Sequence, residues 1–346
     1  MNETPKQLGY HMPAEWEPHT AIWLAWPHDP DSFPQLEQAE WAFADFVAVI
    51  SKTEHIELHV LNDVMEQKVM SLLQQRQCHL SAIRFHHTNY ADIWIRDYGP
   101  IFVVNPTTKQ LAMTKWEYNA YGNKYTELLK DNDVPYIMNQ SLQLPMFKTG
   151  IVLEGGSVDV NGLGTLLTTR QCLLNANRNP RLSEQQIESY LSDYLGVQHV
   201  IWLNEGIEGD DTDGHIDDIA RFINPTTVVC VYTDDTSLVD YKPLHENYQL
   251  LTQAVDQAGQ PLTIIKLPMP AVPKAGSRQL PASYTNFYIG NGVVIVPTFG
   301  TNNDQTVLER LRPLFPGRQV IGLNAYHIVF GAGTFHCMSQ QQPAVR

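Results

Sequence analysis

The sequence predicts an α/β protein, and two observations support this class. Short apolar runs typical of buried strands alternate along the chain with longer segments whose apolar residues recur at helical spacing. Helices also recur between pairs of short strands, which indicates repeated ββαβ-like units, although no clear sequence repeat accompanies them. No Ser-rich linker or charge run marks a boundary. We therefore predict one domain spanning residues 1–346.

The predicted strands are short apolar runs, the first of which is ended by Pro27. They cover Ala21–Trp26, Ile56–Leu61, Ala82–Phe85, Ile101–Val104, Leu111–Trp116, Thr165–Thr169, His199–Leu203, Thr227–Tyr232, Leu262–Leu267, Gly292–Pro297 and Gln319–Gly322. The proline-rich stretch Pro268–Pro281 is predicted to be a surface loop.

The predicted helices carry one apolar face each, and two of them have capping-box spacing at their start. Asp63 and Glu66 have this spacing, as do Ser183 and Gln186. The helical segments are Gln35–Lys52, Asp63–Gln77, a helix beginning at Ser183, Leu244–Ala258 and Thr306–Phe315.

Composition narrows the function classes. A net charge of -14, from 37 acidic and 23 basic residues, disfavours nucleic acid and anionic membranes as partners. No apolar run approaches the ~18 residues that a membrane span needs, and residues 1–19 lack the pattern of a signal peptide. Cys78, Cys172, Cys230 and Cys337 show no paired spacing. We therefore expect a cytoplasmic protein.

Cys337 is the candidate nucleophile. It follows the apolar run 328–330 and a Gly-Ala-Gly turn, so we expect its thiol where a strand gives way to irregular backbone. Gly331 and Gly333 would let main chain approach a ligand closely. The alternative is a small buried structural thiol. His336 would point to the opposite face in extended backbone, so a base must come from elsewhere.

Charged residues also stand beside apolar runs in three other segments. Arg96 and Asp97 precede a Gly-Pro turn, either as a structural ion pair or as part of a site. Glu154 directly follows an apolar run, where partial burial would raise its pKa. His215 and Asp217 would share one face of an extended backbone. Solvated charges at a strand end or surface turn are the alternative for the last two segments.

The acidic stretch 204–218 does not predict a metal site. It imitates part of an EF-hand, but with Gly214 at loop position six, Gly209 and Ala220 occupy positions one and twelve, where ligands belong. The stretch holds one histidine, which makes a transition-metal site a weak hypothesis too.

Taken in order, these segments resemble the agmatine deiminase (agmatine iminohydrolase) family, within the guanidine-modifying superfamily that also holds bacterial-type peptidylarginine deiminases. The order and spacing of the matching blocks are more specific than any one of them, and they cover nearly the whole chain. The blocks are Met12–Pro18, Trp94–Pro100, Glu154–Ser157, Cys172–Asn175, Asn177–Pro180, Asp213–Asp217, Ala282–Phe287 and His336–Pro343. The resemblance implies a five-bladed α/β propeller of ββαβ units around a central active site.

The resemblance also implies a role for each candidate. Cys337 matches the family nucleophile and His215 the general acid/base. Asp97 and Asp217 match the carboxylates that hold the guanidinium, and Glu154 matches a further acidic residue beside His215 and the guanidinium.

Three aromatic or small residues bear on substrate fit. Trp94 matches an aromatic wall against the substrate. Ala332 stands where the family often has Gly, and Tyr121 stands where Trp is expected. Neither departure removes a reacting group, but both bear on how the substrate fits.

The implied activity is hydrolysis of agmatine to N-carbamoylputrescine and ammonia, a step of polyamine biosynthesis, through a covalent thiouronium on Cys337. Carboxylates can hold the planar cation by paired hydrogen bonds and so place its carbon over the sulfur. No metal or organic cofactor is expected. The expected partner is a small cationic guanidine, with neither nucleic acid nor membrane, and self-association stays open.

Two other functions stay open at this point. The same chemistry could act on free or peptidyl arginine, whose carboxylate or amide would need a donor at the far end of the site. A catalytically inactive protein could instead bind guanidines or polyamines, although the joint presence of Cys337, His215, Asp97 and Asp217 argues against it. A papain-like protease has no use for these aspartates. We also expect the carboxylates to raise the pKa of both Cys337 and His215 in the free protein.

Overall fold

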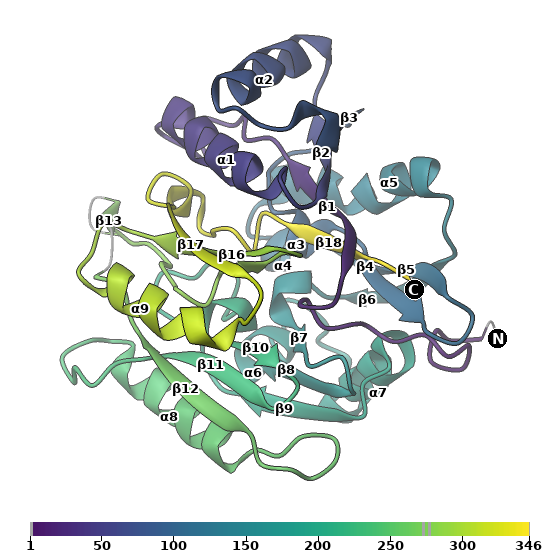
Figure 1. Cartoon of the computed structure of the whole chain (residues 1–346). Helices are drawn as coiled ribbons and strands as arrows, with labels where there is room; N and C mark the ends of the chain where they lie inside the picture. The colour runs from purple at the N-terminus through teal and green to yellow at the C-terminus, as the bar shows by residue number, and fades with distance from the viewer. Residues whose placement is uncertain (1–2, 272–273, 276–277, 346) are drawn as a thin grey trace.

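Strand pairing organises the chain into five similar units. The computed structural model describes residues 3–271, 274–275 and 278–345, and within these residues the strands form five sheets of three or four strands and one two-stranded hairpin. In each of the five sheets a first strand pairs antiparallel with a second, which pairs parallel with a third. The sheets surround a common centre, as Figure 1 shows. This is the five-bladed propeller that the family resemblance implied.

Four of the units follow one another along the chain. Their strands are β4 (Ile101–Asn105), β5 (Gln110–Glu117) and β6 (Met146–Val152); β7 (Asp159–Val160), β8 (Thr165–Thr169) and β9 (His199–Leu203); β10 (Ala220–Asn224), β11 (Thr227–Tyr232) and β12 (Thr263–Pro268); and β15 (Tyr288–Ile289), β16 (Val293–Thr298) and β17 (Gln319–Asn324).

The fifth unit joins the two ends of the chain. β18 (Gln340–Pro343) pairs antiparallel with β1 (His19–Ala25), which pairs parallel with β2 (His55–Val60). β3 (Ile83–His87) adds a fourth strand. The pairing of β18 with β1 closes the ring and holds the segment just before β18 at the centre (Figure 1).

A helix connects the second and third strands of every unit and packs its apolar face on the sheet. These helices are α1 (Leu36–Ile50), α5 (Val134–Leu142), α7 (Glu184–Leu195), α8 (Tyr241–Gln253) and α9 (Asn303–Leu311), while α2 (Asp63–Gln75) leads into β3. Short helices α3 (Ile95–Tyr98), α4 (Ala120–Asn123) and α6 (Arg170–Leu173) lie in the loops. Three apolar clusters fill the spaces between helices and sheets. None of the helices in the described ranges is long and apolar enough to cross a membrane.

Several local predictions are confirmed. Ser183 caps α7 in a full capping box with Gln186, and Ile187, Leu191 and Leu195 form its buried face. A residue in the left-handed conformation, Gly196 (φ 73°), ends this helix. The bounds of β8, β9 and β11 match the predicted strands.

Other local predictions were wrong. Asn62, and not Asp63, caps α2, because its side chain accepts the Met65 N–H. The apolar run before Cys337 is not a strand: Val329–Gly331 forms a 3₁₀ turn that ends at Ala332 in the left-handed region. The predicted loop Pro268–Pro281 lies partly outside the described residues, and its described part includes the hairpin of β13 (Lys274–Ala275) and β14 (Arg278–Gln279).

Candidate active site

The predicted site residues meet at the centre of the ring. Each lies on a segment that leads into the first strand of a unit, and each is buried. Asp97 precedes β4, Glu154 precedes β7, His215 and Asp217 precede β10, Asn286 precedes β15, and Cys337 precedes β18. Every unit thus supplies one segment, so the five-unit architecture itself assembles the cluster.

Cys337 lies in the turn 335–338 before β18 and is only 5% exposed. Its Sγ accepts a hydrogen bond from Asn286 Nδ2 at 2.9 Å and lies 3.5 Å from Asp217 Oδ2. Asn286 Oδ1 in turn accepts the backbone N–H groups of His336 and Cys337, at 3.1 and 3.3 Å. Asn286 therefore fixes both the thiol and its turn. The sequence analysis included it in a matching block but gave it no role.

Arg96 serves the same turn. It donates through Nε to the carbonyl of His336 at 3.3 Å and through Nη1 to Gln340 Oε1 at 2.7 Å. Its own backbone N–H donates to the Cys337 carbonyl at 3.1 Å. An ion pair between Arg96 and the adjacent Asp97 is therefore not the role of this residue: its guanidinium supports the backbone of the turn that holds Cys337.

Three of the predicted site side chains, those of Asp97, His215 and Asp217, lie close to Gly156. Its N–H donates to Asp97 Oδ1 at 2.9 Å. A Cβ at this position would lie 2.7 Å from Asp97 Oδ1, 2.7 Å from His215 Nδ1 and 3.1 Å from Asp217 Oδ2. Only glycine lets the backbone come so close to all three. His215 and Asp217 do share one site as predicted, but through a 3₁₀ turn at Ile216–Asp218 and not through extended backbone.

Several buried polar atoms of the site have no hydrogen-bond partner in the part of the chain that the structure describes. They are Glu154 Oε2, Asp217 Oδ1, Asp218 Oδ2 and both ring nitrogens of His215. A buried acceptor without a donor typically costs about 1–3 kcal/mol. The cluster is therefore suited to a ligand that brings N–H donors and positive charge, as a planar guanidinium does.

A cavity of about 380 Å³ leads to Cys337 and Asp97, with Trp94 and Tyr121 in its walls. Among its described lining residues none is Lys, Arg or His, whereas five besides Asp97 are acidic: Asp29, Asp31, Asp92, Glu127 and Asp211. The cavity is therefore suited to a cationic guest along its length.

Gly331 and Gly333 make room for Trp94. A Cβ on either glycine would lie 2.7 or 2.6 Å from an atom of the Trp94 ring. The two glycines thus let the main chain approach this aromatic wall directly. Ala332 between them has φ 73°, in the left-handed region where a Cβ is unfavourable. This strain is the physical consequence of having Ala where the family often has Gly.

Tyr121 replaces the expected Trp and contacts the site through its hydroxyl. The hydroxyl donates to Asp97 Oδ2 at 3.0 Å, while Gly156 holds the other oxygen of the same carboxylate. The residue itself has a positive φ of 56°. Tyr121 therefore orients Asp97 through its hydroxyl. A Trp at this position has no hydroxyl and could donate only through its indole N–H.

Burial sets the protonation state of the unliganded site. Burial, followed by the charges of Asp217, Asp218 and Asp97, raises the pKa of the Cys337 thiol well above its usual range, as expected. Burial lowers the pKa of His215 to about 3, although Asp217 opposes the shift. The expectation of a raised His215 pKa was wrong, because desolvation of a fully buried imidazolium outweighs its attraction to nearby carboxylates. Both groups are thus neutral before a ligand binds.

The carboxylates respond to their surroundings in different ways. Burial, then the charges of Asp217 and Glu154, raises the pKa of Asp97 well above its usual range. Burial likewise raises the pKa of Glu154, although Arg178 opposes it with an Nε–Oε1 contact of 2.7 Å. Burial also acts to raise the pKa of Asp217, but the hydrogen bond and charge of His336 outweigh it and lower the pKa overall. Asp217 is therefore the carboxylate that stays ionised.

His336 is a site residue that the sequence analysis set aside. Its Nδ1 lies 2.6 Å from Asp217 Oδ2 and its Nε2 lies 2.9 Å from Glu15 Oε2. Arg221 pairs with the same Glu15 oxygen, and the pKa of Glu15 falls although burial opposes this, because Arg221 and His336 lie close. His336 therefore lies between two buried carboxylates, and its hydrogen bond and charge lower the pKa of Asp217. The prediction that His336 points away from the site was wrong, because residues 335–338 form a turn and not extended backbone.

The fold and the site define the class of protein: a ring of five ββαβ units with a buried cysteine, histidine and carboxylate cluster at its centre is a guanidine-modifying enzyme. The model of the Porphyromonas-type peptidyl-arginine deiminase family matches residues 11–343. The chain belongs to this family.

Individual relatives agree with the family match. A Legionella pneumophila (strain Paris) protein, provisionally named agmatine deiminase, is 38% identical over 99% of this chain and 98% of its own length. A structure of agmatine deiminase from Enterococcus faecalis is 34% identical, with a TM-score of 0.93 over 100% of this chain and 99% of that one. A C. jejuni agmatine deiminase with a cysteine-to-serine change and substrate bound is 31% identical, with a TM-score of 0.87 and 97% of both chains covered.

The low pKa of His215, about 3, predicts a neutral imidazole in the unliganded protein across the neutral range. In NMR spectra the ring signal of His215, assigned by its loss in His215→Gln, should not shift between about pH 5 and pH 8. Solvent-exposed histidines in the same spectra should titrate near their reference pKa of about 6.5. A His215 signal that moves with them would contradict the proposed burial effect.

The contacts of His336 predict that it positions and ionises Asp217. In His336→Gln the positive charge is lost, so the pKa of Asp217 should rise and kcat/KM should fall by about tenfold or more near neutral pH, a loss of about 1.4 kcal/mol. Raising the pH should recover part of the loss, because Asp217 ionises again.

A purely structural role would lower kcat/KM of His336→Gln equally at every pH. Glu15→Gln is the matched variant at the far end of the same chain of hydrogen bonds, and it should show a smaller shift in the same direction. Melting temperatures of both variants separate loss of folded protein from loss of ionisation. An equal drop in kcat/KM of His336→Gln across the whole pH range would contradict the proposal that His336 positions and ionises Asp217.

Proposed function

We propose that this protein is an agmatine deiminase, which hydrolyses agmatine to N-carbamoylputrescine and ammonia. One observation carries the proposal: a set of buried acceptors without donors lies beside a cysteine thiol at the end of an acidic cavity. A guanidinium supplies the missing donors and positive charge, and its carbon is the electrophile that a thiolate can attack. The similarity to two agmatine deiminase structures supports the same reaction.

The roles of the site residues form part of the proposal. Cys337 is the nucleophile, and His215 transfers protons. Asp97 and Asp217 bind the guanidinium, and Glu154 accepts from it beside His215. The carboxylates hold the guanidinium carbon near the Cys337 sulfur. This positioning lowers the entropic cost of the attack.

Substrate binding starts the reaction from the neutral pair. The guanidinium charge offsets the aspartates that hold the thiol pKa high, so the Cys337 proton passes to His215 and a thiolate forms. The thiolate forms a C–S bond to the guanidinium carbon. His215 then gives its proton to the departing nitrogen, the C–N bond breaks and ammonia leaves. A cationic S-alkylthiouronium remains on Cys337, and His215 is neutral again.

Water completes the cycle. His215 takes a proton from water while the oxygen bonds to the thiouronium carbon. The C–S bond breaks, the carbonyl of the ureido product forms, and one proton restores the Cys337 thiol. The second proton is released to solvent, where the ammonia released earlier takes it up as ammonium, so one water is consumed for each agmatine. Each step needs only the residues of this site and the substrate.

The cavity favours agmatine over arginine. The tail of agmatine ends in an ammonium, whereas arginine carries an α-carboxylate that would face acidic side chains. No described lining residue is a Lys or Arg that could pair with such a carboxylate. Asp211 is one of the lining acids and accepts a hydrogen bond from the Tyr125 hydroxyl at 2.7 Å. We assign it to the region that receives the tail.

Cys337→Ala tests the covalent step. Turnover of agmatine should be lost while the fold remains, whereas Cys78→Ala and Cys230→Ala, which alter buried thiols outside the cavity, should keep wild-type chemistry. Mass spectrometry of wild-type enzyme quenched during turnover should find the thiouronium on the peptide that contains Cys337. Ammonia release from agmatine, L-arginine and a peptidyl-arginine, measured side by side, decides the substrate. Faster release from either arginine substrate would overturn the choice of agmatine.

Asp211→Asn tests recognition of the tail. The charge of a partly exposed pair contributes up to about 1 kcal/mol, so kcat/KM for agmatine should fall by about fivefold. The same variant should leave kcat/KM for butylguanidine, which lacks the tail ammonium, unchanged. Asp63→Asn, an exposed acid on α2, is the control and should affect neither substrate. Equal losses for both substrates would place Asp211 outside the tail region.

A further inference from the structure

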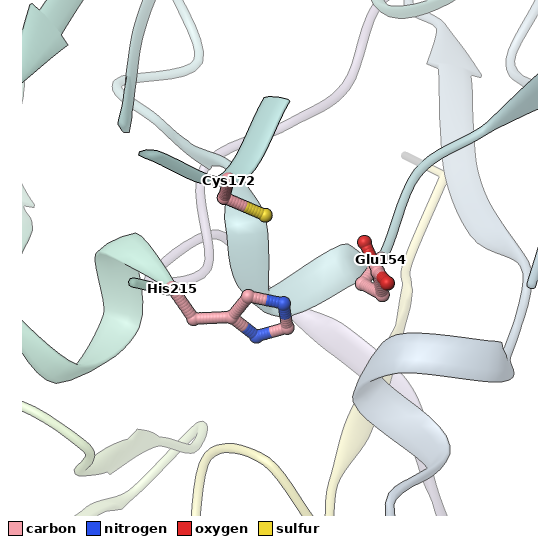
Figure 2. A group of neighbouring side chains, drawn as sticks. All are labelled: Glu154, Cys172 and His215. Carbon is pink, nitrogen blue, oxygen red and sulfur yellow. The ribbon is translucent and has the colours of Figure 1, made fainter. Parts of the chain in front are cut away.

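Cys172 is a buried thiol that the proposed reaction does not use. It lies in α6, is fully buried and does not line the substrate cavity. Its sulfur, a nitrogen of His215 and an oxygen of Glu154 all lie within 4.8 Å of one another. Figure 2 shows the three side chains, from three different segments of the chain, turned toward one shared space.

Two of these three residues offer atoms without a hydrogen-bond partner among the described residues, although Nδ1 of His215 lies 3.5 Å from Asp97 Oδ1. Both ring nitrogens of His215 and Oε2 of Glu154 have no hydrogen-bond partner, and both side chains are fully buried. Only the other oxygen of Glu154 is engaged, by Arg178. A nitrogen of His215 and an oxygen of Glu154 therefore lie beside the Cys172 thiol, in a group whose side chains keep free ligand atoms within the described part of the chain.

We propose that Glu154, Cys172 and His215 form an inhibitory binding site for Zn²⁺ or a similarly soft divalent transition-metal ion. Sulfur, imidazole nitrogen and carboxylate oxygen are the three ligand types that Zn²⁺ takes in proteins, at about 2.0–2.3 Å. Small side-chain rotations bring atoms that are already within 4.8 Å of one another to these distances. Mg²⁺ and Ca²⁺, which prefer oxygen ligands only, do not fit this set.

The protonation of His215 and Cys172 decides how an ion would bind. Metal ligation needs a neutral imidazole, and burial keeps His215 in that form. Burial, followed by the charge of Glu154, raises the pKa of the Cys172 thiol, so without an ion the sulfur holds its proton. A bound ion would displace this proton to solvent as the metal–sulfur bond forms.

A bound ion would stop the reaction in two ways. It would occupy His215, which then can neither accept the Cys337 proton nor activate water. It would also use the Glu154 oxygen that the guanidinium needs, so metal and agmatine would exclude each other. Inhibition by Zn²⁺ should therefore be competitive with agmatine and reversible by a chelator.

The experiment must distinguish this metal site from a second group of possible metal ligands. Asp217, Asp218 and Cys337 also lie within 4.8 Å of one another, and metals often inhibit thiol enzymes through the nucleophile itself. The two sites differ in the cysteine that they use. Variants of Cys172 and Cys337 therefore decide between them.

The activity experiment compares Cys172→Ala and Cys172→Ser with Cys230→Ala. Cys230 is as deeply buried but lies in β11, outside every candidate metal group in the described residues. All three variants should turn over agmatine near the wild-type rate. The apparent inhibition constant for Zn²⁺ should rise by more than roughly tenfold in both Cys172 variants, since even outer-shell changes cost a metal site about 10–100-fold in affinity. Inhibition of the Cys172 variants at the wild-type Zn²⁺ concentration would overturn the proposal.

A binding experiment gives a readout that does not depend on turnover. Co²⁺ added to Cys337→Ala protein should produce a thiolate-to-cobalt charge-transfer band, since Cys172 remains. The band should vanish in the Cys172→Ala/Cys337→Ala double variant. If Cys337→Ala shows no band, or the double variant keeps it, the assigned site is wrong. This result stands whether or not agmatine is the substrate.

Discussion

The cost of removing ionisable groups from water at the centre of the ring is the constraint on which the contacts of the site depend. Asp97, Glu154, Asp217 and Asp218 are almost completely buried there with His215. Removing a single ion from water costs several kcal/mol even after the protein relaxes. The site therefore needs compensating partners that stabilise its charges without filling the positions that a substrate must reach.

Cations placed behind the carboxylates provide this compensation. Arg178 binds one oxygen of Glu154 and leaves the other unpartnered among the described residues. His336 does the same for Asp217, and is itself held by Glu15, which pairs with Arg221. Each of these two carboxylates thus has one oxygen held by a buried basic side chain and one oxygen without a partner among the described residues. The charge network stabilises the fold and, by the same contacts, leaves the centre short of positive charge.

The sequence predicted the parts of the molecule that depend on local pattern. Capping at Ser183 and the apolar run of β8 need only neighbouring residues, and both were correct. The pairing of β18 with β1 could not be predicted from pattern, because Gln340–Pro343 is polar and becomes a strand only by closing the ring. The family resemblance supplied that ring; the sequence pattern alone reached an α/β class of repeated ββαβ-like units.

In the site, too, the sequence predicted what depends on residue type and missed what depends on the surroundings in the folded chain. The residue types of Cys337, His215 and Asp217 made them candidates, and the family resemblance gave each of them a proposed role. Their protonation was not visible. It depends on how completely each group is desolvated, and desolvation wins over nearby carboxylates at His215. The role of His336 was hidden for a similar reason, because a tight turn and not an extended strand aims it at Asp217.

Closure of the ring by β18 links the stability of the fold to the position of Cys337. Cys337 stands three residues before β18, and the guanidinium of Arg96 ties its turn to Gln340, the first residue of that strand. The strand that completes the fifth sheet therefore also anchors the turn that holds Cys337, the proposed nucleophile. Fraying of β18 from β1 would release the ends of the ring and, at once, loosen the hydrogen bonds that hold the thiol against Asn286 and Asp217. In this architecture the strand that closes the ring also holds the turn of the proposed nucleophile.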